Sequence, residues 1–180
     1  MSKSKYNHEE RARLRIAAMV GPEKYPYFAT VFFGMGARAT PEIPTMGVDA
    51  KGRLYLNPST LDEYSREEFE SVIVHETWHI LLRHFSRGLV FFGNQKALTE
   101  NAKLWNIACD MEIHGGQMVD RYVFPLPGDY VCPKKRGWPT GKTAEWYARK
   151  LQEEEEAPPP PLCGCPACGA PASALVIRAG

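Results

Sequence analysis

The chain has 180 residues, of which 44% are hydrophobic and 24% are charged. This length suffices for one domain with an apolar core, and the composition excludes a wholly disordered protein. Lys and Arg together number 22 against 21 Asp and Glu, so the formal net charge is +1. This balance argues against a dedicated binder of nucleic acid or acidic membranes, because such proteins carry an excess of positive charge.

The N-terminal segment MSKSKYNHEERARLR is polar and is not followed by the apolar region of a secretory signal. No apolar run approaches the roughly 20 residues that a bilayer-spanning helix needs. The five cysteines are an odd number, and Cys163, Cys165 and Cys168 lie close together, unlike the dispersed pairs of a disulfide framework. We therefore expect a cytoplasmic protein with no membrane association.

The first part of the chain predicts a helix and a β-hairpin. Arg, Ala, Leu and Ile recur at helical spacing over residues 9–20, and Gly21-Pro22 ends the pattern. Residues 25–33 are apolar and aromatic, with no period that distinguishes helix from strand. Short apolar runs at 45–48 and 53–56 flank an Asp-Ala-Lys-Gly turn, which predicts the hairpin.

Ser65 begins the helix with the clearest signals. Ser65 and Glu68 form a capping-box pattern, and apolar residues then recur at helical spacing with no Gly or Pro before Gly88. A second long helix is expected from about Thr99 to His114, with two glycines ending it.

The last part predicts a loop, a helix and a tail. Residues 124–139 contain four prolines and two glycines, and Thr143 can cap a helix reaching about Gln152. Residues 153–180 hold an acidic and Pro-rich linker and a Cys-containing segment, which predicts a flexible tail. We expect a mostly helical α+β domain over residues 1–152.

The motif HETWH at residues 75–79 points to metal chemistry. His75 and His79 are one helical turn apart, so both imidazoles project from one face and can bind a single ion. Glu76 is rotated by about 100° from His75, so its carboxylate can reach a water at an open coordination position. The alternative is two ordinary half-buried histidines and a surface carboxylate.

A catalytic zinc ion needs a third protein ligand. Asp110 is the strongest candidate, because zinc accepts carboxylate oxygen and an unpaired charge among apolar neighbours is costly. Asp110 could instead orient one of the imidazoles or face outward. His84 is half a turn from His75 on a continuous helix and can bind the ion only if that helix breaks.

His114 follows Asp110 by four residues and so shares its helix face. It would lie near the metal without being a ligand. There it could polarise the substrate carbonyl or hold the developing oxyanion. Alternatively, it caps the C-terminus of its helix.

Four segments resemble the putative metallopeptidase domain of bacteria and phages: TMGVDAKGRLYLNP, EEFESVIVHETWHILLRHFSR, WNIACDMEIH and GKTAEWYARKL. The resemblance covers roughly residues 10–152 and implies a zincin-like fold for the domain expected over residues 1–152, with a small sheet and a central HExxH helix. It places His75, Glu76 and His79 in the metal motif and Asp110 at the matching acidic position. His114 stands where relatives usually carry Asn. In longer members a von Willebrand factor A-like domain follows.

These observations predict a zinc-dependent metallopeptidase with one catalytic ion. Zinc held by His75, His79 and Asp110 lowers the pKa of bound water toward about 7. Glu76 accepts the proton as the general base, and the hydroxide attacks a peptide carbonyl. The hairpin is predicted to bind an extended protein or peptide substrate by β-augmentation.

Two other functions are consistent with the sequence. A SprT-like, DNA-associated metalloprotease also pairs HExxH with C-terminal cysteines, but it needs a four-ligand zinc ribbon and a basic surface, and the nucleic-acid signal here is weak. A non-catalytic, metal-stabilised interaction module would partner an ATPase or a von Willebrand-like protein and keep the motif for folding.

Overall fold

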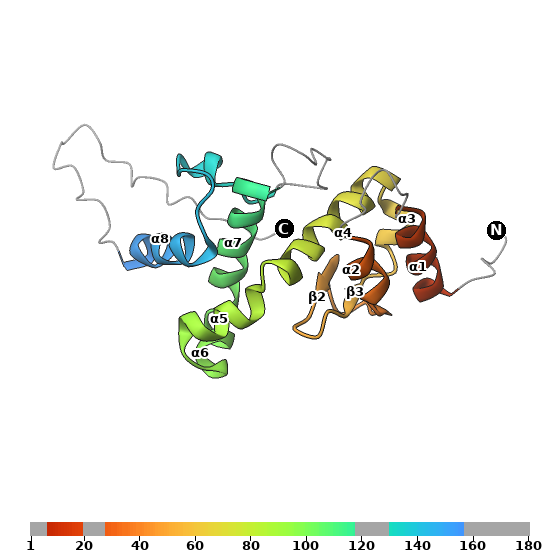
Figure 1. Ribbon diagram of the computed structural model, residues 1–180, viewed down its shortest axis with the longest axis horizontal. Helices are drawn as coiled ribbons and strands as arrows, with labels where there is room; N and C mark the ends of the chain where they lie inside the picture. Colours follow the sequence, from red (N-terminus) through yellow and green to blue (C-terminus); the bar gives the residue numbers. More distant parts are fainter. Residues whose placement is uncertain (1–6, 20–27, 118–129, 157–180) are drawn as a thin grey trace, which may run out of the picture.

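The computed structural model describes residues 7–19, 28–117 and 130–156 of the chain. It is mostly helical with one small three-stranded sheet, which confirms the predicted α+β class (Figure 1). Its helices are α1 (His8–Met19), α2 (Ala29–Gly34), α3 (Thr60–Glu63), α4 (Arg66–Leu81), α5 (His84–Phe92), α6 (Gln95–Glu100), α7 (Ala102–Glu112) and α8 (Ala144–Glu156), joined by a π-helical turn η1 (Ile113–Gln117) and a 3-10 turn η2 (Pro133–Arg136).

The sheet contains the predicted hairpin and one further strand. Strands β2 (Met46–Val48) and β3 (Leu54–Leu56) pair antiparallel, and β1 (Ala37–Ala39) pairs parallel with β3. The strand order is β1-β3-β2, so β2 lies at one edge. Strand β1 was not predicted, because its three residues are too few to show an alternating pattern.

The N-terminus of α4 has the predicted capping box. Ser65 Oγ accepts the backbone N–H of Glu68 at 3.1 Å, and the Glu68 carboxylate accepts the backbone N–H of Ser65 at 2.8 Å. These bonds satisfy two backbone donors that a helix start leaves unpaired.

The C-terminus of α4 differs from the prediction of a helix that continues toward Gly88. The helix ends at Leu81, and Arg83 adopts a left-handed conformation with φ 57° before α5 begins at His84. Residues other than glycine are uncommon in the left-handed conformation. Because this position holds Arg and not Gly, no residue in the sequence marks the end of the helix.

The predicted second long helix is also divided. Thr99 belongs to α6, whose last turn is closed by the Asn101 side chain donating to the Ala97 carbonyl, and α7 begins at Ala102. At its C-terminus α7 continues into the π-helical turn η1. Gly115 and Gly116 lie within this turn, so they do not end the helical segment as predicted. Gly115 is required there, because a Cβ would lie 2.9 Å from Pro133 and 3.0 Å from Tyr147.

Two apolar clusters form the core. The N-terminal cluster gathers the sheet, α1, α2 and the inner face of α4, including Phe32, Leu54, Leu56, Phe69 and Ile73. The C-terminal cluster joins α7 and α8, including Trp105, Ala108, Cys109, Met111, Tyr147 and Leu151. Figure 1 shows α1–α3 and the sheet at one end of α4, and α5–α8 at the other. Helix α4 therefore connects the two parts of the fold.

Some predictions concern residues outside the described ranges. These are the tail beyond Glu156 with its cysteines, residues 124–129 of the predicted loop and the first residues of the segment at 25–33. The predicted domain boundary at residue 152 falls inside α8. Within the described ranges, no helix combines the length and apolar character needed to cross a membrane.

Replacing Gly88 with Ala tests the packing of α5 against α7. The new Cβ would lie 2.5 Å from Trp105 Nε1 and 3.0 Å from Leu98. We expect a net loss of unfolding free energy in urea denaturation, because overpacking costs about 1–3 kcal/mol and outweighs the higher helix propensity of Ala, about 1 kcal/mol. Gly34→Ala is the control, since nothing lies within 4 Å of a Cβ there. Equal stability of the two variants would contradict this packing.

Candidate metal centre

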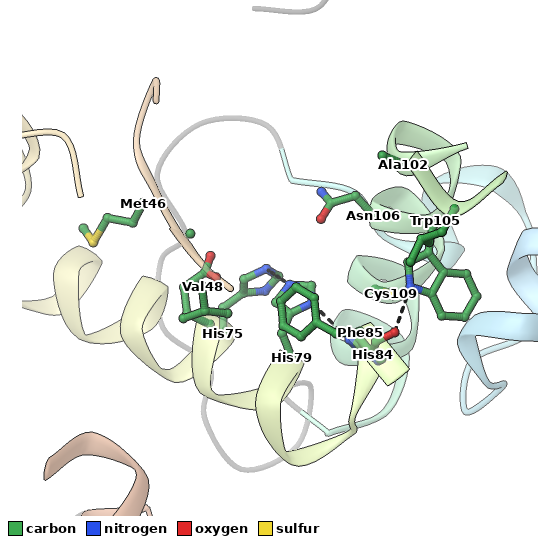
Figure 2. Close-up of a pocket in the computed structure, with 13 residues that line it drawn as sticks. Met46, Val48, His75, His79, His84, Phe85, Ala102, Trp105, Asn106 and Cys109 are labelled. Atoms are coloured by element: carbon green, nitrogen blue, oxygen red, sulfur yellow. Dashed lines mark hydrogen bonds between the residues drawn. The ribbon is translucent and has the colours of Figure 1, made fainter. Parts of the chain in front are cut away.

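Three side chains from two helices converge on one point. His75 and His79 project from α4, and their Nε2 atoms lie 3.0 Å apart. Asp110 of α7 places Oδ1 3.3 Å from each of these nitrogens. The structure therefore brings together the three residues that the sequence analysis selected as metal ligands. Figure 2 shows the two imidazoles rising from α4 into a pocket between β2 and α7.

The spacing of these donor atoms suits a small divalent ion. Ligands at about 2.0–2.1 Å from a tetrahedral zinc ion are about 3.3–3.4 Å apart, close to the separations here. Asp110 Oδ1 is buried, and none of its contacts has hydrogen-bond geometry. Buried polar atoms rarely lack a partner, so this oxygen independently indicates that the site fits a cation.

Asp110 and His75 influence each other's pKa. Burial would raise the pKa of Asp110, but its interactions with His75 and His79 outweigh burial and lower that pKa. Burial likewise would lower the pKa of His75, and Asp110 reverses the direction. Asp110 is therefore a carboxylate at neutral pH, the form that coordinates a metal.

Glu76 lies beside the three convergent groups. It is buried, and burial raises the pKa of its carboxyl group. His75, His79 and a backbone hydrogen bond from Val48 act in the opposite direction. Since Val48 belongs to β2, the edge strand of the sheet lies against the carboxylate.

Two cavities meet at the convergent groups. One, of about 320 Å³, has an apolar end lined by Phe85, Leu98, Ala102 and Trp105. The other, of about 290 Å³, is lined by Tyr64, Tyr130 and Val131. Both are also lined by Met46, His75, Glu76 and Asn106, so together they form a groove along β2 that passes the candidate ligands.

His114 lies behind His75. Its Nε2 is 3.1 Å from His75 Nδ1, and its Nδ1 contacts the carbonyl oxygen of Val131. Burial, followed by the nearby His75, lowers the pKa of His114 to about 4, so the ring is neutral at pH 7. Both nitrogens have partners, so the geometry favours a role in orienting His75 over the predicted contact with substrate.

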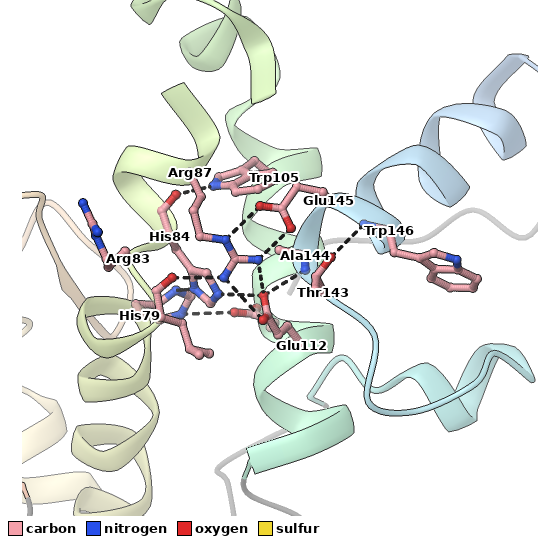
Figure 3. A network of polar contacts seen from close by, with 12 residues as sticks. His79, Arg83, His84, Arg87, Trp105, Glu112, Thr143, Ala144, Glu145 and Trp146 are labelled. Carbon is pink, nitrogen blue, oxygen red and sulfur yellow. Dashed lines mark hydrogen bonds and ion pairs between the residues drawn. The ribbon is translucent and has the colours of Figure 1, made fainter. Parts of the chain in front are cut away.

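His84 takes a corresponding position behind His79. Because α4 ends at Leu81, the chain turns and His84 Nδ1 lies 3.0 Å from His79 Nδ1. His84 Nε2 is 3.2 Å from the Glu112 carboxylate, which also accepts hydrogen bonds from Arg87 (Figure 3). From the sequence, His84 was a candidate only as a ligand, and no role was predicted for Glu112 or Arg87. No motif signals these residues, because their proximity depends on the break in the helix.

Cys109 creates a second group with metal-binding potential. Its sulfur and one nitrogen each of His79 and His84 lie within 4.8 Å of one another. Burial raises the pKa of the Cys109 thiol, with Asp110 and Glu112 adding to the effect. A thiol held in its protonated form is a poor ligand, so this group is less suited to a metal than His75, His79 and Asp110.

The comparisons with known proteins place most of the chain in one family. The family model described as "Putative metallopeptidase domain" matches residues 7–158. No curated protein and no solved structure matches the chain.

Metal binding by these residues can be measured directly. We expect Asp110→Ala to weaken zinc binding by more than about 100-fold, since loss of a ligand costs at least as much as loss of a group that orients one. Glu153→Ala is the control, because it also removes one carboxylate, but from an exposed residue of α8 that pairs with Lys150. Zinc content after dialysis against a chelator reports the difference. Similar retention of zinc by both variants would exclude Asp110 as a ligand.

Proposed function

This chain belongs to the putative metallopeptidase family, and we propose that it is a zinc-dependent peptidase with a zincin-like site. The observation that carries the proposal is the convergence of His75, His79 and Asp110 beside a buried Glu76. Two imidazoles and one carboxylate, with a groove leading to them, are the ligand set of a catalytic zinc ion in hydrolases.

His75, His79 and Asp110 would hold the ion beside the groove. A bound zinc ion supplies a Lewis acid that polarises a carbonyl oxygen and lowers the pKa of water. Asp110 contributes the negative charge that balances part of the charge of the ion. His75 and His79 contribute Nε2, and each is held in orientation through Nδ1 by another histidine.

Glu76 has the properties of the general base. Its carboxylate lies next to His75 on the groove, and burial raises its pKa toward the working range of a base at neutral pH. In the proposed reaction, Glu76 accepts a proton from the attacking water and later donates it to the amine of the cleaved peptide bond. Val48 of β2 lines the same cavity as Glu76, so the edge strand borders the proposed base.

Strand β2 is suited to bind an extended peptide. The backbone hydrogen bonds from Asn57 to Thr45 and from Asp49 to Arg53 show that alternate residues of this strand face β3. The backbone groups of Met46 and Val48 therefore face the opposite side, toward Glu76 and the groove. A substrate that adds to this edge would run past the proposed zinc ligands.

The test of catalysis is Glu76→Gln. We expect this variant to bind zinc with near wild-type affinity and to lose at least about 10²-fold in kcat/KM on a peptide library, because general base catalysis contributes that much. Glu67→Gln is the control, since Glu67 is an exposed residue of the same helix. A Glu76→Gln variant that cleaves peptides at the wild-type rate would refute the assigned base. A wild-type protein that binds zinc and cleaves none would favour the interaction module.

The edge strand can be tested by amide hydrogen exchange on the Glu76→Gln protein with a peptide bound. We expect exchange of the Met46 N–H to slow, because it faces the groove. Exchange of the Gly47 N–H should change little, because Gly47 faces Tyr55 within the sheet. Unchanged exchange at Met46 together with protection on another element would place the peptide elsewhere.

A further inference from the structure

We propose that His84 and Glu112 are positioning residues that fix the proton and the orientation of the ligand His79. This inference deepens the proposed function and rests on it, because it concerns a metal bound through His79 Nε2. It is carried by an unbroken series of polar contacts from His79 Nδ1 to the start of α8 (Figure 3).

The protons in this series can be assigned in only one consistent way once His79 Nε2 faces a metal. A neutral imidazole has one donor and one acceptor nitrogen, so His79 carries its proton on Nδ1. This proton is donated to His84 Nδ1, which lies 3.0 Å away. His84 then carries its own proton on Nε2, 3.2 Å from a Glu112 oxygen that can accept it.

Glu112 is held firmly enough to impose this arrangement. Its Oε2 accepts the Arg87 guanidinium at 2.9 Å and the backbone N–H of Ala144 at 2.8 Å. Arg87 in turn donates to the Glu145 carboxylate at 2.7 and 2.8 Å. These bonds link α5, α7 and the first turn of α8.

The backbone of His84 is fixed as well. Its carbonyl oxygen accepts the indole N–H of Trp105 at 3.0 Å, and the side chain is 2% exposed. The ring therefore has little freedom to leave His79. A carboxylate that orients a metal-bound imidazole usually does so directly, whereas here a second imidazole transmits the effect.

The support behind the other ligand is different in kind. His75 contacts His114, and that series ends on the backbone carbonyl of Val131. Among the described residues of the site, only the series behind His79 ends on ionised side chains. Its loss should therefore change the affinity for the metal, because a carboxylate behind an imidazole raises the basicity of the ligand.

Three variants test the role of this series. His84→Ala removes the acceptor for His79 Nδ1–H, His84→Asn retains an oxygen near the position of Nδ1, and Glu112→Gln removes the charge. Glu154→Gln is the control for charge, because Glu154 of α8 pairs with Arg136 away from the site. The measurements are zinc affinity by competition with a chelating dye, the visible spectrum of the cobalt(II) form, and the unfolding midpoint of the metal-free protein.

We expect His84→Ala to weaken zinc binding by about 10- to 100-fold, the range for groups that orient a ligand. His84→Asn should recover part of this loss, Glu112→Gln should weaken binding less than His84→Ala, and Glu154→Gln should leave it unchanged. The cobalt(II) spectrum should shift in His84→Ala. A purely structural role would lower the unfolding midpoint and leave zinc affinity and the cobalt spectrum unchanged, and that result would overturn the proposal.

Two further results would also overturn it. A sulfur-to-cobalt charge-transfer band that Cys109→Ala abolishes would make His84 a ligand together with His79 and Cys109. A wild-type protein that binds no zinc would remove the basis for both proposals. A protein whose zinc affinity depends on His84 as expected, but which cleaves no peptide, would contradict the peptidase function alone.

Discussion

The position of the buried Oδ1 of Asp110, in a side chain that is otherwise partly exposed, is the constraint on which the candidate site depends. A carboxylate within an apolar helix is costly unless another group compensates its charge. His75 and His79 of a different helix each place a nitrogen 3.3 Å from the same oxygen but make no hydrogen bond to it, so the charge is only partly compensated. His75 and His79 of α4 therefore lie next to Asp110 of α7, and the two cavities meet at His75.

Two departures from regular α-helix geometry position the histidines that lie behind the proposed ligands. The left-handed residue Arg83 ends α4 and brings His84 behind His79. The π turn η1 carries His114 behind His75 and inserts Ile113 into the N-terminal cluster. Insertions of this kind often occur at functional sites. Both proposed imidazole ligands consequently have a histidine behind them, although the two histidines come from different elements.

Features that depend only on residues close together in the sequence could be predicted. The capping box at Ser65, the common face of His75 and His79 and the β2–β3 hairpin follow from short-range spacing, and the structure shows all three. Asp110 could be selected because a charge among apolar residues needs a partner. The roles of Glu112 and Arg87 could not be predicted, because their contacts join three helices. The end of α4 was missed because Arg83 has no side-chain feature that marks a left-handed residue.

The division of the core into two clusters has a consequence for the stability of the fold. The proposed ligands come from both sides of the boundary, since α4 packs in one cluster and α7 in the other. An ion bound by these residues would link the two clusters, and its binding free energy would add to the free energy of folding. Removal of the ion would therefore loosen the contact between the two clusters, while each cluster kept its own apolar core.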